Sequence, residues 1–199
     1  MGKSILDSVD STTEEMILSD YKYNNTIYVN DEIDRDLQIK FCRQMRKLAK
    51  DELAKIEQDR RPIKIRITSY GGSVYSYYAM ASEIERAKDS GLIVETYCDG
   101  FAYSAGAYLL MLGTKGHRYA TRYCDILLHQ CNFGMGRVTH QEAKDTIESL
   151  DRCWEVLKDI MKKNTNLTEE EMNNFLVTNR DYRYNGEEAI KKGIIDELL

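Results

Sequence analysis

The feature that most constrains this chain is a repeated alternation between short β-branched runs and longer stretches with helical periodicity. The strand-like runs are rich in isoleucine, valine, threonine and tyrosine. They cover residues 26–29, 63–67, 92–98, 118–121 and 124–128. Neighbouring parallel strands are joined by crossover helices. The alternation therefore predicts an α/β fold with a mainly parallel sheet.

The expected helices fill the intervals between and after these strands. They cover residues 31–58, 73–88, 104–112, 139–163, 168–177 and 187–192. Residues 1–25 are polar and have no sustained apolar period, so we expect a flexible N-terminal segment there. A length of 199 residues suits one domain. We accordingly expect a single domain over residues 26–199.

The longest expected helix, residues 139–163, has two features of its own. Thr139 and Glu142 have the spacing of a capping box, which satisfies free N–H groups at a helix start. A helix of roughly 25 residues is about 37 Å long. One small domain cannot cover that length, so we expect part of the helix to pack against another subunit. Its apolar stripe consists of Ile147, Leu150, Trp154, Leu157 and Ile160.

Charge and hydropathy exclude several classes of function. The formal net charge of −5 argues against a nucleic-acid-binding protein, which needs a basic face. No apolar run approaches the roughly 18 residues of a membrane span. No signal-peptide core follows the first residues. These observations favour a cytoplasmic protein that binds neither nucleic acid nor membrane.

Cysteine and histidine usage bears on metal binding. The chain has five cysteines, an odd number without a C-x-x-C pair, and three histidines that are not near two cysteines. This disfavours a disulfide framework and a zinc site. We expect all five cysteines to be reduced thiols that act as small hydrophobic residues. No metal or other cofactor is predicted.

Two glycine-containing turns fall where strands end and helices begin, the edge of an α/β sheet where active sites gather. The Gly71-Gly72 pair lets backbone N–H groups approach a ligand closely, although a plain tight turn explains it equally well. Ser104 has small residues two positions away on each side, Ala102 and Gly106. This resembles the crowding of a nucleophile elbow. The alternative is a serine that only caps its helix.

A serine nucleophile needs a base and an orienting acid. His129 ends an apolar strand at the same kind of sheet edge as Ser104, whereas His117 and His140 lie at expected surface positions. Asp181 stands in a short segment between two helices, from which a fixed carboxylate could reach a histidine. Spacing alone does not select it among 33 acidic residues.

Several of these segments resemble signature segments of ClpP, the proteolytic component of the Clp protease. Residues 100–107 read Gly-Phe-Ala-Tyr-Ser-Ala-Gly-Ala, similar to the family pattern Gly-x-Ala-Ala-Ser-Met-Gly-Ala. Other similar segments occur in family order at residues 65–73, 125–130, 180–189 and 192–196. Together they extend the resemblance over roughly residues 26–199, far more than one short motif would.

The resemblance implies a fold, a site and a reaction. The fold is the one that ClpP shares with crotonases, with repeated β-β-α units and a protruding handle helix at about residues 139–163. Ser104 would be the nucleophile, His129 the general base and Asp181 the acid that orients the imidazole. Backbone N–H groups of Gly72 and Ala105 would form the oxyanion hole. The reaction would be peptide hydrolysis through an acyl-enzyme.

The resemblance also implies partners. ClpP-like subunits form heptameric rings that stack face to face into a tetradecamer, with the long helix at the contact between rings. The substrates would be unfolded or small polypeptides. ATP would enter only through a partner, an AAA+ unfoldase, and this subunit would need no cofactor. Residues 4–25 do not align with the axial loops through which ClpP engages such an unfoldase.

Departures from the family pattern keep two other functions open. Tyr70 and Cys131 stand where the family has prolines, Tyr103 where it has alanine, and Ala105 where it has methionine. A catalytically silent ring subunit that acts as a scaffold or regulator is one alternative. A crotonase-type acyl-CoA enzyme, which has this general fold and a similar oxyanion turn, is the other.

Overall fold

A computed structural model of the chain describes residues 5–131, 139–177 and 180–199. Its α-helices are α1 (Ile5–Asn24), α2 (Arg35–Leu53), α3 (Val74–Asp89), α4 (Ala105–Met111), α5 (His140–Asn164), α6 (Glu169–Val177) and α7 (Gly186–Lys191). Its strands are β1 (Thr26–Val29), β2 (Ile63–Ser69), β3 (Val94–Tyr103), β4 (Arg118–Ala120), β5 (Asp125–Leu128), β6 (Tyr182–Tyr184) and β7 (Glu197–Leu198). A short 3₁₀ helix, Glu57–Asp59, follows α2.

The strands form one mixed sheet that is mainly parallel. Strands β1, β2, β3, β4 and β7 are neighbours in that order, and all of them pair in parallel. The long strand β3 pairs with β4 through residues 96–98 and with β5 through residues 101–103. Only β6 is antiparallel in the described ladders, and it pairs with β5. The predicted α/β fold is confirmed.

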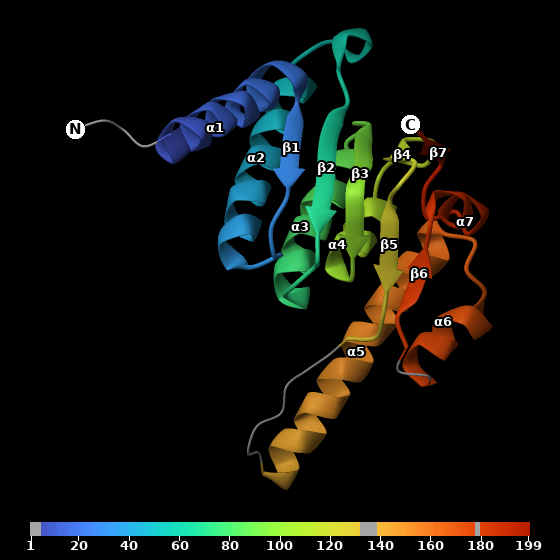
Figure 1. Ribbon diagram of the computed structural model, residues 1–199. Coiled ribbons are helices and arrows are strands. Elements are labelled where there is room, and N and C mark those ends of the chain that lie inside the picture. Colours follow the sequence, from blue (N-terminus) through green and yellow to red (C-terminus); the bar gives the residue numbers. More distant parts are fainter. Residues whose placement is uncertain (1–4, 132–138, 178–179) are drawn as a thin grey trace.

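Helices cover one face of this sheet, and strand β2 explains why. Ile63, Ile65 and Ile67 are fully buried, while the residues between them are half-buried, so one face of the strand is apolar. Figure 1 shows α2, α3 and α4 behind the strands, on that side. One contiguous core cluster runs from Ile27 in β1 to Ile195 before β7. Burial of this face holds the sheet edge in place.

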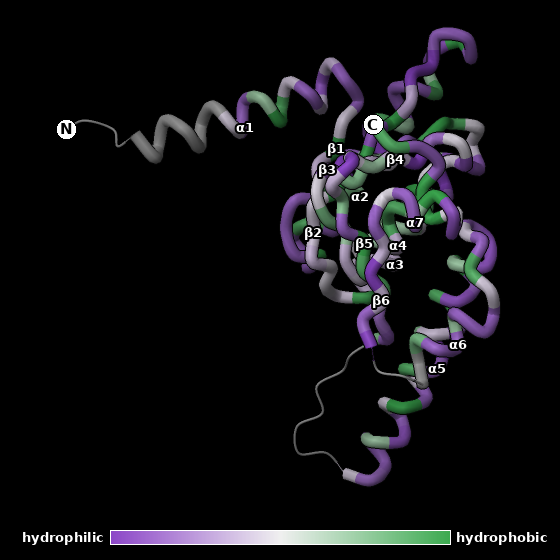
Figure 2. Tube along the Cα trace, turned by 45° about the vertical axis from the view of Figure 1, so that its right-hand side comes forward, coloured by the Kyte–Doolittle hydropathy of each residue, from purple (hydrophilic) through white to green (hydrophobic). Residues whose placement is uncertain are grey.

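The N-terminal segment differs from the expectation. The sequence indicates no regular element before residue 26, but residues 5–24 form helix α1, which stands clear of the body in Figure 2. The last turns of α1 are the part of the helix that contacts the body of the protein. Tyr21 packs against the core, and Asp20 accepts a hydrogen bond of 2.6 Å from the Tyr28 hydroxyl. Residues 13–24 of this helix have no buried side chain, so they give no apolar period for sequence analysis to detect. Its flexibility stays a prediction.

Helix α5 leaves the body as expected, with its first residues farthest out (Figure 1). The predicted capping box of Thr139 and Glu142 is confirmed. The apolar stripe, however, divides into two parts. Trp154 and Leu157 are buried within this chain, whereas Ile147 is 52% exposed. Trp154 and Leu157 thus belong to the core of their own subunit, and contact of part of the helix with another subunit stays a prediction for its first half.

Smaller differences lie near the sheet edge. Residues 99–103 extend β3 where a turn is expected, and the short strands β6 and β7 are not predicted. Two- and three-residue strands are stabilised by their neighbours in the sheet and carry almost no periodic signal. The sequence predicts a loop at residues 130–138. Residues 132–138 of this segment lie outside the described residues.

Candidate active site

Ser104 occupies a strained turn between β3 and α4. Its backbone has φ 52° and ψ −123°, and in the described chain only Asn25 is another non-glycine residue with positive φ. The Ser104 N–H donates to the Leu127 carbonyl at 2.8 Å, and its own carbonyl accepts from Ala107 N–H at 2.9 Å. Such a conformation persists only where its surroundings enforce it. The predicted elbow geometry is present, and the serine hydroxyl does not cap the helix.

A close approach of the Gly71 backbone helps to enforce this turn. Gly71 has φ +93°, and a Cβ atom at this position would lie 2.7 Å from the Ser104 Cβ and 2.8 Å from the Tyr103 carbonyl oxygen. Only glycine fits there without displacing the serine. Sequence analysis singled out the glycine pair for its N–H groups and did not find this steric role.

The second glycine of the pair leaves an N–H group free. Ile33 forms a parallel bridge here by donating to the Gly71 carbonyl at 2.7 Å and accepting from Ser73 N–H at 2.8 Å. The Gly72 N–H therefore has no backbone acceptor in the described chain. The Ala105 N–H is also free, because it is the first residue of α4. Gly72 and Ala105 both line the cavity that contains Ser104.

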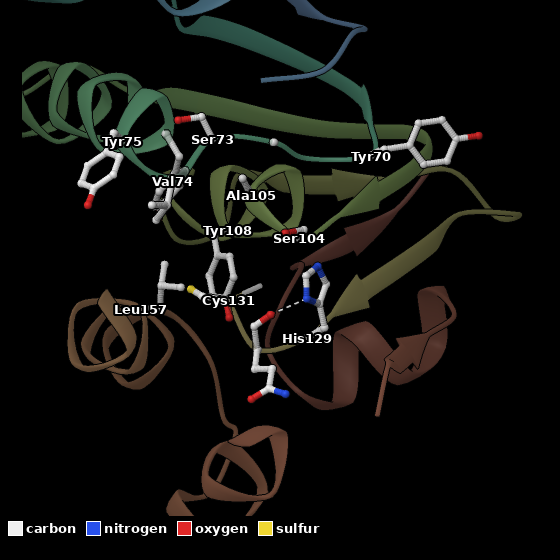
Figure 3. Close-up of a pocket in the computed structure, with 13 residues that line it drawn as sticks. Tyr70, Ser73, Val74, Tyr75, Ser104, Ala105, Tyr108, His129, Cys131 and Leu157 are labelled. Carbon is white, nitrogen blue, oxygen red and sulfur yellow. Dashed lines mark hydrogen bonds between the residues drawn. The ribbon is translucent and has the colours of Figure 1, made fainter. Parts of the chain in front are cut away.

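His129 follows β5 and lines the same cavity, which has a volume of about 380 Å³. In Figure 3 one ring nitrogen faces Ser104 and the other is joined to the Gln130 carbonyl oxygen. This second nitrogen is Nδ1, at 2.5 Å from the oxygen. Because a carbonyl oxygen only accepts, Nδ1 carries a proton, and in the neutral ring Nε2 then has the lone pair. The ring can accept a proton on the side of Ser104.

Asp181 lies just before β6, as His129 lies just after β5. In the antiparallel ladder of β5 and β6, Ile126 is opposite Tyr184 and Leu128 is opposite Tyr182, and the ladder ends there. Continued by one residue, this register would place His129 opposite Asp181. Directly opposite residues of antiparallel strands have Cβ atoms about 4.5–5.5 Å apart. The Asp181 side chain is nonetheless exposed, and the structure shows no hydrogen bond or ion pair between it and His129.

A polar cluster that the sequence did not predict joins β3, β5 and β6, the strands that adjoin Ser104, His129 and Asp181. The Tyr103 hydroxyl donates to Asp125 Oδ2 at 2.6 Å, and Arg183 forms an ion pair with the same carboxylate. The hydrogen bond to Asp125 raises the pKa of Tyr103. Arg183 also lies over the Tyr103 ring, 5.1 Å from its centroid. Tyr103, Asp125 and Arg183 thus link β3, β5 and β6 at the edge of the site.

The wall of the cavity next to α5 is aromatic and contains sulfur. Tyr77 and Tyr108 are buried there, with ring centroids 6.1 Å apart. Cys131 Sγ lies 3.0 Å from Cys153 Sγ of α5, and both thiols are free. The hydrogen bond from Cys131 lowers the pKa of Cys153 to about 6. The sequence did not identify this wall, since tyrosines in α3 and α4 look like ordinary core residues.

Two further searches cover the described residues. They contain no group of three or more histidine, cysteine, aspartate or glutamate side chains that could hold a metal ion. In the same part of the chain, every helix is too short or too polar to cross a membrane.

Comparisons with known proteins find similarity over most of the chain. The family model of the Clp protease matches residues 10–199. The ATP-dependent Clp protease proteolytic subunit 2 of Prochlorococcus marinus is 36% identical over 146 residues, 72% of this chain and 69% of that protein. Subunit 3 from Synechococcus is 33% identical over 143 residues, again 72% and 69%. Subunit 2 from Mycolicibacterium paratuberculosis is 28% identical over 199 residues, all of this chain and 89% of that protein.

Proposed function

The chain belongs to the Clp protease family, and on that premise we propose that it is the serine endopeptidase subunit of a ring-shaped protease. The observation that carries the proposal is the cavity shared by Ser104, His129, Gly72 and Ala105. A nucleophile, a base and two candidate oxyanion donors meet there. The strained turn at Ser104, the hydrogen bond from His129 Nδ1 to the Gln130 carbonyl and the position of Ala105 at the start of α4 support these roles.

The first step would be attack of the Ser104 oxygen on a peptide carbonyl. His129 Nε2 takes the serine proton, since Nδ1 already donates to the Gln130 carbonyl. Negative charge then develops on the carbonyl oxygen. The free N–H groups of Gly72 and Ala105 would stabilise that charge, and the Ala105 N–H does so from a helix N-terminus.

The second half of the reaction uses the same groups. The imidazolium of His129 returns its proton to the leaving amine, which releases the first product. Water then attacks the acyl-enzyme, and His129 again acts as base. Asp181 would stabilise the imidazolium from the opposite position of the β5–β6 ladder. For that role its exposed carboxylate must turn toward the ring.

Membership of the family also implies a ring oligomer, and we propose heptameric rings stacked into a tetradecamer. Helix α5 supports this assembly, because its first half projects from the body and exposes Ile147. Enclosing the serine would restrict cleavage to unfolded or small polypeptides. The relatives are named ATP-dependent, so ATP would act through a partner AAA+ unfoldase and this subunit would need no cofactor of its own.

A second candidate function is a catalytically silent ring subunit. The observation that favours it is the exposed Asp181 carboxylate, which makes no hydrogen bond or ion pair with His129. A triad without its acid keeps the fold and the assembly surfaces but loses most of its rate. The two functions differ in one measurable property, which is turnover of peptides.

Hydrolysis of small fluorogenic peptides by the purified protein, beside Ser104→Ala, tests the proposal. We expect turnover in the wild-type protein and none above background in the variant. The oligomer should be the same in both, because loss of one hydroxyl leaves the core unchanged. Absence of turnover in both proteins favours the silent subunit. Equal turnover in both means that another residue, or a contaminant, performs the reaction.

A further inference from the structure

Two cysteines are in contact beside the candidate active site, and no step of the proposed reaction uses them. Cys131 Sγ is 3.0 Å from Cys153 Sγ, and both thiols are free. Figure 3 shows the Cys131 sulfur on the side of the cavity next to α5. An S–S bond is about 2.05 Å long, so a movement of about 1 Å would bring the two sulfur atoms to bonding distance.

A small oxidant can reach this pair through the cavity. Cys131 lines the cavity and is partly exposed, and Cys153 is 6% exposed. The chain contains a second pair, Cys98 and Cys124, whose thiols are hydrogen-bonded to each other. Both members of that second pair are buried, and neither lines the cavity. Of the two pairs, the one beside the active site is therefore the accessible one.

The charge state of the pair suits disulfide chemistry. The thiolate is the reactive form of cysteine. The hydrogen bond between the two thiols lowers the pKa of Cys153 to about 6 and raises the pKa of Cys131. At neutral pH one thiolate thus lies next to one thiol, and a disulfide forms when one sulfur of such a pair is oxidised and the other attacks it.

A bond between these cysteines would connect a fixed helix to the segment that follows the base. Cys153 directly precedes the buried Trp154 on α5. Cys131 is two residues after His129, and its peptide bond with Gln130 contains the carbonyl oxygen to which His129 Nδ1 donates. Bond formation should therefore move Cys131 more than Cys153. That movement would shift the Gln130 carbonyl and disturb the imidazole.

We propose that hydrogen peroxide converts Cys131 and Cys153 into a reversible disulfide, and that this bond lowers peptidase activity by displacing the hydrogen-bond acceptor of His129. The Cys153 thiolate attacks one peroxide oxygen, the O–O bond breaks, and a sulfenic acid and hydroxide form. The Cys131 sulfur then attacks the Cys153 sulfur, the S–O bond breaks, and the leaving hydroxide takes the Cys131 proton. Two thiols and one peroxide give one disulfide and two waters.

Mass mapping tests the bond itself. The purified protein is treated briefly with hydrogen peroxide, and the remaining free thiols are then alkylated. We expect a loss of two hydrogen atoms and one pair of peptides linked through Cys131 and Cys153, which dithiothreitol separates. Cys131→Ser should remove the link, and Cys124→Ser, in the second pair, is the matched control that should keep it.

The wild-type protein decides the matter even where a variant does not fold. Two thiols that stay free, a link between Cys98 and Cys124 in place of the expected one, or sulfonic acid at Cys131 without a link would overturn the proposal.

Hydrolysis of a fluorogenic peptide by the same samples tests the effect on His129. We expect oxidation to lower kcat by at least about tenfold, because a displacement of about 1 Å at a catalytic group has an effect of this size or larger. Dithiothreitol should restore the rate. In Cys153→Ser the ratio of treated to untreated rates should stay near one, whatever the untreated rate is. An equal loss of rate in this variant would assign the effect to another oxidised residue.

The effect on activity rests on the proposed peptidase function, whereas formation of the bond does not. A linked protein that hydrolyses peptides at its full rate contradicts the effect on His129 alone. A reduced protein without hydrolysis and without fluorophosphonate labelling of Ser104 contradicts the proposed function, and the effect on activity with it. Mass mapping still decides whether the disulfide forms.

Discussion

The two ends of the proposed triad are built in opposite ways. Ser104 is held by its backbone, with a hydrogen bond to Leu127, a close approach by Gly71 and the buried helix α4 behind it. Asp181 is exposed, and it faces His129 only through the register of two short strands. The nucleophile is preorganised before substrate binds, whereas the acid depends on how well β6 is held.

This difference indicates where the protein can regulate its activity. The strained conformation of Ser104 is held by the surrounding core, which would have to rearrange for the turn to relax. Strand β6 has only three residues, and it is held by its ladder with β5 and by side-chain contacts of Tyr182 with Phe175 and of Arg183 with Asp125. Variation in activity should therefore arise mainly from changes at Asp181 and β6.

The largest effect is expected from Asp181→Asn. It should lower kcat by about 10⁴-fold while the fold is kept, because an amide no longer stabilises the imidazolium of His129. Asp125→Asn is the matched control, since Asp125 lies at the same sheet edge but pairs with Arg183. Peptide hydrolysis should fall less than tenfold in this control. Similar losses in both variants would show that the register does not identify the acid.

Phe175→Ala tests how β6 is held. Phe175 is fully buried, edge-on to Trp154 at 6.3 Å and tilted against Tyr182 at 4.5 Å between ring centroids. Its removal should cost about 3–5 kcal/mol of unfolding free energy and reduce kcat in the protein that remains folded. Urea unfolding and peptide hydrolysis measure the two effects, with Tyr123→Ala as an exposed control. Full kcat in folded Phe175→Ala would separate the acid from this aromatic contact.

Gly71→Ala tests the nucleophile side. The new Cβ would meet the Ser104 Cβ at 2.7 Å, so we expect loss of peptidase activity and destabilisation by about 1–3 kcal/mol. Gly91→Ala is the control, because Gly91 also has a positive φ, +81°, but has no heavy atom within 4 Å of the added Cβ. It should lose some stability and keep its activity. An active Gly71→Ala protein would mean that the turn at Ser104 is more adaptable than the contacts imply.

The smallest effect is expected from Arg183→Met. This change removes the ion pair with Asp125 and the hydrogen bond of 3.0 Å to the Tyr103 hydroxyl. The Arg183 side chain is 53% exposed, so solvent screens its ion pair and the loss of unfolding free energy should be small. Thermal unfolding at low and high salt measures it. A loss of several kcal/mol would show that the cluster, and not Phe175, carries the attachment of β6.

The sequence predicts the part of the fold that repeats. Strand β2 and helix α5 follow from alternation in isoleucines and from a capping box, which are local signals. Helix α1 is missed because residues 13–24, the part of it whose side chains are described, have no buried side chain. Strands β6 and β7 are missed because two or three residues carry no period, and they exist only through pairing with distant strands.

In the candidate site, too, local features are predictable from the sequence and long-range contacts are not. Ser104 is predictable because small neighbours are a local requirement of its turn. The proposed partnership of Asp181 with His129 depends on a register between segments 52 residues apart, so the sequence alone does not select Asp181 among the 33 acidic residues. Tyr77 and Tyr108 are typical core residues in sequence. Only the fold places them at the wall of the cavity.

Labelling with a fluorophosphonate, followed by mass mapping of the adduct, tests the central claim most directly. The reagent reacts with a serine that has a working base and oxyanion site, and it requires no particular peptide sequence. We predict one adduct per chain at Ser104, none in Ser104→Ala and slower labelling in Asp181→Asn. An unlabelled wild-type protein, or an adduct that persists in Ser104→Ala, would contradict the claim that Ser104 is a preorganised nucleophile.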